Sequence, residues 1–476
     1  MDDFDDILED QHDHKLLFDA YYGKGGFKKG FFLFKHPRES QKKYDRRRKM
    51  AYYSNYLRPI IDSHVDPIFR KEPKREWKDN AAFSAYILDV DTCGTGMNRF
   101  MKKAALIAKI FAVAFIFTDN FADLPQNLAA TLKERCLPYS YIVTPDRLDS
   151  YKINRFGKLT SITITEPAED AEGNVKDGVI NKRTWTTTTW KLTGEDGKVI
   201  SKGEHNLGRL PVTVLYSNQV QREDTLPQSE FYDIARMSVS LYNRCSELDE
   251  VLSNQAFNIL TYPLGDTQRA KDIEEIITGT ENMLGYDGTL GGKPDFISPK
   301  SEPADLQMKQ LDRLVQEMHR MARLSHVTGV EKQTSGVSKA YDFENTNQNL
   351  GDFAANIEEA EKDMAAVFEL WAGGGSKLEY TASYDRDFGM IDIEQVLKEA
   401  DEALLLNIGS KFNAAVKKKV VAAYLPELPE KEYDEITKEI DENTKNEVYA
   451  ADSMQQVATQ QQQTKKLDTG QQAGAA

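Results

Sequence analysis

Three long stretches of the chain place apolar residues at helical spacing and contain few residues that interrupt a helix. Residues 229–260 contain neither Pro nor Gly, and one helix face collects Phe231, Ile234, Val239, Tyr242, Leu248 and Leu252. A second pattern covers residues 304–327, and a third covers residues 339–371, just before Gly373-Gly374-Gly375. Because residues three and four apart share a helix face, each stretch predicts one long helix.

Shorter apolar patterns predict further helices in the N-terminal half. Residues 52–69 and 98–117 have helical spacing, and residues 125–135 suit a short helix. The most apolar stretch, residues 104–117, is interrupted by Lys109 and is shorter than the ~20 residues that cross a bilayer, so we expect a buried helix and no membrane segment. Residues 1–34, first acidic and then rich in Gly and aromatic residues, predict an irregular arm.

Residues 138–220 change to the alternation and β-branched composition of strands. We expect strands at residues 140–144, 159–165, 183–192 and 206–216. The Asp196-Gly197 pair predicts a hairpin turn between strands, because Asp-Gly accepts the positive φ angles of tight turns. A further short strand is expected at residues 378–384.

The remaining segments complete a mixed pattern. Residues 266–300 predict a short helix at 273–277, followed by strand-like pieces that glycines such as Gly285 and Gly288 separate. Residues 391–448 predict helices with breaks at Gly409 and at the two prolines after residue 425. The Gln-rich residues 451–476 are expected to be disordered. Helices and mainly antiparallel strands in separate blocks indicate the α+β class.

Composition narrows the functional classes. The 61 Lys and Arg residues face 76 Asp and Glu residues, for a formal net charge of −15. Tight DNA binding over the whole surface is therefore not expected, because it relies on cations that neutralise phosphates; transient contact stays compatible. The acidic start does not resemble a signal peptide. The three widely spaced cysteines predict reduced, buried thiols in a cytoplasmic setting.

One segment departs from this acidic average. Residues 35–49 are strongly basic and end in Arg46, Arg47, Arg48 and Lys49. Such a run is most often a solvated helix face, and the alternative is a contact with DNA or with an acidic neighbour on a capsid. Under either interpretation, exchanging the three arginines for Gln is expected to leave the subunit fold intact.

The sequence contains no convincing catalytic constellation. A phosphate-binding GxxxxGK[ST] loop, an HExxH motif and a GxSxG motif are all missing. His319 and His326 lie seven residues apart, which is too far for one metal without other ligands. We therefore expect no enzyme activity, no metal and no cofactor.

The order of elements is more informative than any motif. Two long predicted helices, 229–260 and 304–327, flank an insertion of about 40 residues. If the helices lie antiparallel, they carry the insertion away from the body as a stalk carries a head. A segment with glycines then leads into the third long helix. This order indicates a subunit of an assembly more than an enzyme with a cleft.

In series, five stretches of the chain resemble the portal proteins of tailed double-stranded DNA bacteriophages. The order and spacing of these stretches span most of residues 50–400. Ser338 stands where the family has Ala in the last stretch, and Ala340 follows two residues later. The five are the early helix around Tyr52–Asp62 that leads to Pro73, the Ala-rich run Ala104–Asp119, the Leu-Gly-x-x-Pro-Val-like Asn206–Val212, the first stem helix Ser229–Leu260 with Tyr242-Asn243 and Ser246, and Thr334–Ala340.

The resemblance implies an α+β portal-like subunit with an α/β wing, a two-helix stem, a small mixed clip and a helical crown. Its domains would be an arm and wing at 1–228, stem helices at 229–262 and 301–327, the clip at 263–300, and the tunnel loop at 328–338. A long helix and wing return would occupy 339–390, the crown 391–450, and the disordered tail 451–476.

The resemblance also implies a function. Portals form dodecameric rings at one vertex of the virion capsid after synthesis in the host bacterial cytoplasm. They guide double-stranded DNA through a central channel without sequence specificity during packaging and ejection. The implied partners are eleven further copies, the large subunit of terminase, the major capsid protein and scaffold, and a head-completion or adaptor protein. The acidic composition suits a channel wall that lets DNA slide.

Two groups of site residues follow from the resemblance. The tunnel loop facing DNA would be Val330, Glu331, Lys332, Gln333, Thr334 and Ser335, with Gly329 and Gly336 as pivots, because glycine permits backbone angles that other residues resist. The clip would bind partners through Gly285, Tyr286, Asp287 and Gly288.

Two rival hypotheses stay open at this stage. Another virion structural protein, such as a connector or tail subunit, would explain the missing active site but not the helix–insertion–helix order. A metal-dependent nucleic-acid enzyme would use the many carboxylates, and nuclease activity on plasmid DNA would favour it.

Overall fold

The structure is a computed structural model that divides into two units, residues 1–388 and 389–476. Helices and strands are mixed in it, which confirms the predicted α+β composition. It describes residues 14–121, 128–169, 174–218, 225–256, 259–264, 283–287, 293–297, 302–324, 336–373, 378–388, 393–406, 408–425, 428 and 432–443. Residues 328–335 of the expected tunnel loop 328–338, the helix expected at 273–277, Gly288, His326 and the tail 451–476 lie outside these ranges. The last three residues of that expected loop, 336–338, are helical.

The centre of the first unit is a helix that runs into a doubly buried strand. Helix α7 (Met97–Phe111) ends at Ala112, whose left-handed φ of 70° turns the chain into β2 (Val113–Asp119). Strand β2 lies between β3 (Tyr139–Val143) and β9 (Val212–Tyr216), antiparallel to both. The helix expected over 98–117 is therefore wrong for residues 113–117, which belong to β2.

A five-stranded antiparallel meander covers one face of that central sheet. Trp185, Ile162 and Ile164 of the meander join Phe115 and Phe117 of β2 in one apolar cluster. The predicted hairpin is present between the last two strands, with Gly197 at a φ of 74°. Residues 183–192 form parts of two strands and not the single strand expected. The strands are β4 (Leu148–Ile153), β5 (Leu159–Glu169), β6 (Val175–Thr186), β7 (Thr189–Thr193) and β8 (Val199–Glu204), in that spatial order.

The long helix α11 (Gly336–Trp371) ties the central sheet to a separate two-stranded ribbon. Asp363 on α11 accepts two hydrogen bonds from the guanidinium of Arg209, at 2.7 and 2.8 Å, just before β9. At the end of α11, the Trp371 indole N–H donates to the Thr118 carbonyl of β2 at 2.7 Å. The ribbon pairs β1 (Lys74–Glu76) with β13 (Thr381–Ser383), so the predicted strand at 378–384 is present but shorter.

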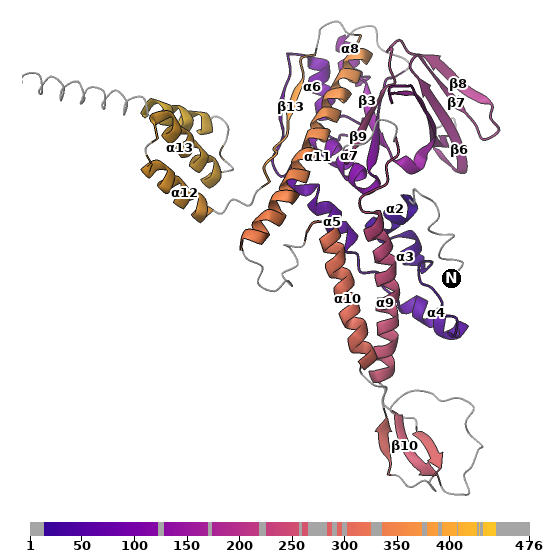
Figure 1. The fold of residues 1–476 in the computed structure, drawn as a ribbon. Helices are drawn as coiled ribbons and strands as arrows, with labels where there is room; N and C mark the ends of the chain where they lie inside the picture. Colours follow the sequence, from indigo (N-terminus) through magenta and orange to yellow (C-terminus); the bar gives the residue numbers. More distant parts are fainter. Residues whose placement is uncertain are drawn as a thin grey trace, which may run out of the picture. The chain divides into compact units, whose positions relative to one another are not determined.

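Two antiparallel helices leave this body side by side (Figure 1). Helix α9 (Tyr232–Ala256) and helix α10 (Glu302–Met321) are antiparallel, because Ile234 near the start of α9 shares a core with Met318 near the end of α10. Both helices were predicted, but α9 stops four residues before the expected residue 260. Two residues later the chain forms strand β10 (Ile259–Leu264).

The segment between α9 and α10 contains a three-stranded sheet. Strand β10 is central, with β11 (Met283–Asp287) parallel on one side and β12 (Asp295–Ile297) antiparallel on the other. Pro263 is tolerated in the central strand because β12 pairs only with residues 259–261, so the missing N–H falls beyond the end of that pairing. The sequence had suggested that Gly285 separates two strands, but this residue lies inside β11.

Short helices of the N-terminal half pack around the same body. Residues 14–29 form two helices, so the irregular arm predicted for residues 1–34 is wrong for its described part. The apolar pattern at 52–69 is divided between a helix and a short 3-10 turn. The elements are α2 (His14–Tyr22), α3 (Gly25–Lys29), α4 (Gln41–Met50), α5 (Leu57–Ser63), η1 (Asp66–Phe69), α6 (Ala81–Leu88), α8 (Leu128–Glu134) and the turn η2 (Pro145–Arg147).

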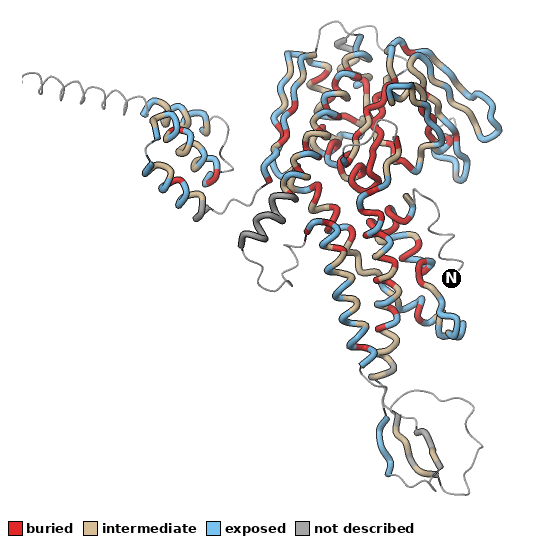
Figure 2. Tube along the Cα trace, viewed as in Figure 1, coloured by how far each residue is buried: buried red, intermediate tan, exposed pale blue. Residues whose placement is uncertain are grey.

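The main core lies where these helices meet the central sheet (Figure 2). Strand β2 contributes alternate residues to two cores, since Ala114 and Ile116 face the helices while Phe115 and Phe117 face the meander. The predicted burial of the cysteines is wrong, because Cys93 is exposed and Cys136 and Cys245 are only half-buried; none of the three thiols forms a disulfide. Among the described residues, no helix has an apolar run long enough to cross a bilayer.

The second unit is a helical segment. It contains α12 (Ile393–Leu405), α13 (Ser410–Tyr424) and further helical residues at 432–443. The predicted break at Gly409 is confirmed, because this glycine immediately precedes α13.

Candidate functional site

One face of helix α9 holds the N-terminal segment 24–50, which contains the basic run. The Tyr242 hydroxyl donates to the Phe27 carbonyl at 3.2 Å. The Asn243 side chain accepts from the Phe34 N–H at 2.8 Å and donates to the Phe32 carbonyl at 2.7 Å. These α9 residues share a helix face with Ser246 and Glu250, so the spacing of three and four positions builds one docking strip.

Helix α4 begins after a tight turn that its own side chains cap. The Glu39 N–H donates to the His36 carbonyl at 2.9 Å, with Pro37 at the second position, where its fixed φ suits a turn. Ser40 is the N-cap and accepts from the Lys43 N–H at 3.3 Å. The turn and the cap together orient Tyr44 and Arg47, the fourth and seventh residues after Ser40. The Tyr44 side chain reaches the chain that precedes α4, and the Arg47 side chain also reaches α9.

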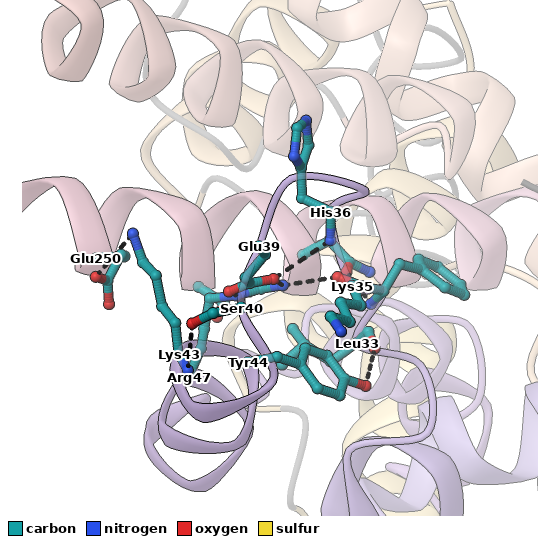
Figure 3. Close-up of polar contacts among 12 residues, drawn as sticks. Leu33, Lys35, His36, Glu39, Ser40, Lys43, Tyr44, Arg47 and Glu250 are labelled. Carbon is teal, nitrogen blue, oxygen red and sulfur yellow. Dashed lines mark hydrogen bonds and ion pairs between the residues drawn. The ribbon is translucent and has the colours of Figure 1, made fainter.

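Arg47 is the anchor of this segment (Figure 3). Its guanidinium donates twice to the Glu39 carboxylate, at 2.9 and 2.8 Å, and once to the Phe34 carbonyl at 2.7 Å. The Ser246 hydroxyl on α9 lies 3.5 Å from the same group. Arg47 is only 6% exposed and Glu39 7%, so the pair is buried. The sequence hypothesis that Arg47 touches DNA or a capsid surface does not fit this position, because its donors are already bound inside the subunit.

The other members of the basic run point outward. Arg46, Arg48 and Lys49 are exposed. The side chain of Arg48 lies against Gly30, where an added Cβ would come within 2.5 Å of its Cγ. Lys43 forms an ion pair with Glu250 of α9 at 3.2 Å, which adds a second link between the helices. The hypothesis of a partner contact therefore applies to Arg46, Arg48 and Lys49.

The ion pair predicts a pH dependence of the docked segment. The hydrogen bonds from Arg47 lower the pKa of Glu39 below its ordinary value. The folded state therefore binds fewer protons than the unfolded state in the acid range, and stability rises with pH. The contribution is complete above the ordinary pKa of a glutamate and is lost as the pH falls through the lowered folded value.

We expect Glu39→Gln to reduce the free energy of unfolding by about 1.5–3 kcal/mol at pH 7, and by much less near pH 3. Urea midpoints of both proteins measured between these pH values check this. A difference in unfolding free energy that is equally large at pH 7 and near pH 3 would contradict the ion pair between Arg47 and Glu39. Glu435→Gln, in the second unit, is a control expected to show no difference at any pH.

Three of the four clip residues, those that the structure describes, lie on strand β11. Gly285, Tyr286 and Asp287 pair with residues 262–264 of β10. The Tyr286 hydroxyl donates to the Lys293 carbonyl at 3.3 Å, and the Thr261 hydroxyl donates to the Asp295 carbonyl at 2.8 Å. On the edge strand β12, Phe296 and Ile297 are exposed. Sequence reasoning missed these two apolar side chains, whose exposure no local pattern indicates.

The structure describes both ends of the proposed tunnel loop. Helix α10 ends in a cap in which Arg323 takes a left-handed φ of 59°, and the Leu324 N–H donates to the His319 carbonyl at 2.8 Å. Thr346 of α11 donates to the Arg323 carbonyl at 2.9 Å. Gly336, one of the predicted pivots, is the first residue of α11. The other pivot, Gly329, and residues 330–335 lie outside the described residues.

Two charged clusters, each with at least one buried member, were not predicted from the sequence. In the sequence, Lys109 stood out only as an interruption of an apolar stretch. In the structure its ammonium group donates to the Glu230 carboxylate at 2.7 Å and lies 4.5 Å from the centre of the Phe353 ring. Beside this pair, burial lowers the pKa of His64. Elsewhere, Arg75 of β1 bonds Glu361 of α11. Both clusters join elements far apart in sequence, and their partners therefore carry no local signal.

His319 takes part in packing. Its Nδ1 lies 2.8 Å from the Val315 carbonyl, and its ring meets Tyr56 edge-on. Within the described ranges, no three His, Cys, Asp or Glu side chains gather as a metal site would require. In comparisons with known proteins, the chain matches no family model and no curated protein sequence.

Proposed function

We propose that the chain is the subunit of a portal-like ring that forms a DNA channel at a capsid vertex. The observation that carries the proposal is the antiparallel pair α9 and α10 with a small sheet between them, followed by the 36-residue helix α11. This order matches the stem, clip and long helix that the resemblance implies. In the proposed ring, residues 330–335 of the tunnel loop would line the channel, and the clip would bind terminase and a head-completion protein.

Exposed apolar side chains on the helix pair support assembly with further copies. Leu306 and Met308 on α10 are 70% and 41% exposed, and Leu252 on α9 is 42% exposed. Exposed large apolar side chains are typical of surfaces that another protein covers. In a ring, the next copy would supply that cover, because every subunit presents the same two surfaces to its neighbours.

The exposed edge of the clip supports a second, different contact. Phe296 on β12 is 60% exposed. Only residues 298–301 separate the end of β12 from the start of α10. An edge strand with an apolar residue offers main-chain and side-chain contacts to a partner strand. Terminase and the head-completion protein are the partners that the portal proposal assigns to it.

Electron microscopy of the purified chain tests the proposal. We expect negatively stained rings with a central hole, and a dodecamer of the 54.0 kDa chain would weigh about 650 kDa in mass photometry. Monomers or filaments at micromolar concentration would count against it. Leu306→Gln should weaken the rings at least tenfold, whereas Leu88→Gln, an equally exposed leucine on α6, should leave the mass unchanged.

A further inference from the structure

The N-terminal segment has a charge opposite to that of the chain as a whole. Residues 24–49 contain eleven Lys and Arg residues and two acidic ones, Glu39 and Asp45, although the full chain has a net charge of −15. Only Arg47 is buried among these cations. The remaining charge is therefore concentrated on the outside of the segment, where like charges repel unless a counter-charge approaches.

Five of the exposed cations lie in α3 and α4, and the chain at the end of α3 meets α4 where Gly30 lies against Arg48. We call Lys28, Lys29, Arg46, Arg48 and Lys49 the basic surface. Lys28 and Lys29 form the last turn of α3, which ends at Gly30, and Gly30 lies directly against the side chain of Arg48. Among the described residues, the acidic group paired with one of these five cations is Asp45, 3.9 Å from Arg48. Both partners of that pair are more than 40% exposed, so it neutralises little charge.

Apolar side chains border the basic surface. Phe31 is 63% exposed and Met50 is 59% exposed, and Lys29 lies 5.9 Å from the centre of the Phe31 ring. The surface therefore fits an occupant that combines several negative charges with a few apolar groups.

The same chain contains a segment with this composition. Residues 1–13 include seven acidic residues and no Lys or Arg, and Phe4, Ile7 and Leu8 follow helical spacing among them. The segment directly precedes His14, the first residue of α2, and α2 contacts both α3 and α9. The seven acidic residues are Asp2, Asp3, Asp5, Asp6, Glu9, Asp10 and Asp13.

The segment is long enough to reach the basic surface. Helix α2 has nine residues and so spans about 13 Å, after which α3 follows within three residues. Thirteen extended residues reach up to about 43 Å. A segment tied this close acts at an effective concentration in the millimolar range, well above that of a free partner.

We propose that residues 1–13 lie on the basic surface of the same chain and compete there with phosphate polyanions. The contact combines the seven carboxylates with the five cations, and Phe4, Ile7 and Leu8 with Phe31 and Met50. Nucleic acid then gains the surface only by displacing the segment. The inference does not depend on ring formation, since every contact in it belongs to one chain.

A zero-length carbodiimide crosslinker tests the contact directly, because it joins carboxylates to lysine amines that touch. Mass spectrometry should find residues 1–13 linked to Lys28, Lys29 or Lys49, with a yield that does not depend on protein concentration. Links that form only at high concentration would assign the segment to a second copy and overturn the proposal. Finding no such link would also overturn it.

A binding experiment tests the competition. A labelled 20-base-pair duplex is titrated with the full chain and with a variant in which the seven acidic residues are changed to Asn or Gln. The neutral variant should bind at least tenfold tighter and show a steeper salt dependence, because more phosphates contact cations. Equal affinity of the two proteins would contradict the proposal.

A third protein separates the basic surface from other cations. It combines the neutral N-terminus with Lys28→Gln, Lys29→Gln, Arg46→Gln, Arg48→Gln and Lys49→Gln, all at exposed positions. The gain in duplex affinity should disappear in this background. If the gain persists, the acidic segment covers some other surface and the proposed occupant of the basic surface is wrong.

Discussion

Glu361→Ala is expected to lower the free energy of unfolding of the first unit by about 3–5 kcal/mol, one of the two largest effects of a single change in this chain. The carboxylate of Glu361 is fully buried in α11. It accepts from the Arg75 guanidinium at 2.6 and 3.1 Å and from the hydroxyls of Tyr380 and Tyr384. Its removal would leave the Arg75 charge without its partner in a largely buried place.

The cluster also explains why the loss would spread through the unit. Burial, and then the neighbouring Glu361 charge, raise the pKa of Tyr380 and Tyr384, so both phenols stay protonated and donate. Arg75 belongs to β1, and Tyr384 follows β13. The carboxylate therefore attaches both strands of the ribbon to the long helix, and the ribbon is expected to detach when the carboxylate is removed.

Urea unfolding followed by circular dichroism measures the effect of Glu361→Ala. Glu359→Ala is the matched control, because this residue is two positions away on the same helix but exposed, and the loss there should stay within about 0.5 kcal/mol. Equal midpoints for the two variants would show that the buried cluster does not hold the ribbon. Glu361→Gln should fall between them, since the amide keeps part of the hydrogen bonding.

Arg47→Met is expected to cost about 3 kcal/mol and to release the N-terminal segment from α9. Methionine keeps the apolar stem but removes the charge, which leaves Glu39 buried with no cation on it. Amide hydrogen exchange should therefore rise across residues 27–50, while helix α11 keeps its protection.

The neighbouring residue supplies the control for Arg47→Met. Arg46→Met removes the same charge one position earlier, but from an exposed side chain. Unfolding and exchange should be close to those of the unchanged protein. If Arg46→Met were as destabilising as Arg47→Met, the loss of stability could not be attributed to the burial of Arg47. Because Arg47 is buried on Glu39, we now expect that it, unlike Arg46 and Arg48, does not tolerate Gln without a loss of stability.

Local patterns predicted the long elements well. The helices α9, α10 and α11 follow from apolar spacing, and the predicted stretches 229–260 and 304–327 also lack Pro and Gly. Such local signals suffice because helix hydrogen bonds join residues only four apart. The Asp196-Gly197 hairpin follows from the backbone angles that this pair accepts. The second half of the apolar run 104–117 was mistaken for a helix because β2 is buried on both faces, and a strand without a polar face has no alternation to detect.

Strand β10 and the buried position of Arg47 also could not be predicted from local patterns. Residues 259–264 continue the apolar pattern of α9, but they become a strand because β11 and β12 provide hydrogen-bond partners from 20 to 40 residues away. Among four adjacent basic residues, no local feature distinguishes Arg47; the turn at Glu39 and the strip on α9 select it. Its acidic partner lies eight residues away and its hydroxyl partner 199 residues away.

By itself, the sequence determined the α+β composition, the three long helices, the acidic surface and the opposite charge of residues 24–49, because these depend on residue types and on short-range spacing. Tertiary structure alone decided that residues 113–119 and 259–264 are strands, that Arg47 and Glu361 are buried, and that Phe296 is exposed. Each of these depends on which distant segment lies next to the residue, and the free energy of burying a charge or pairing a strand comes from that neighbour.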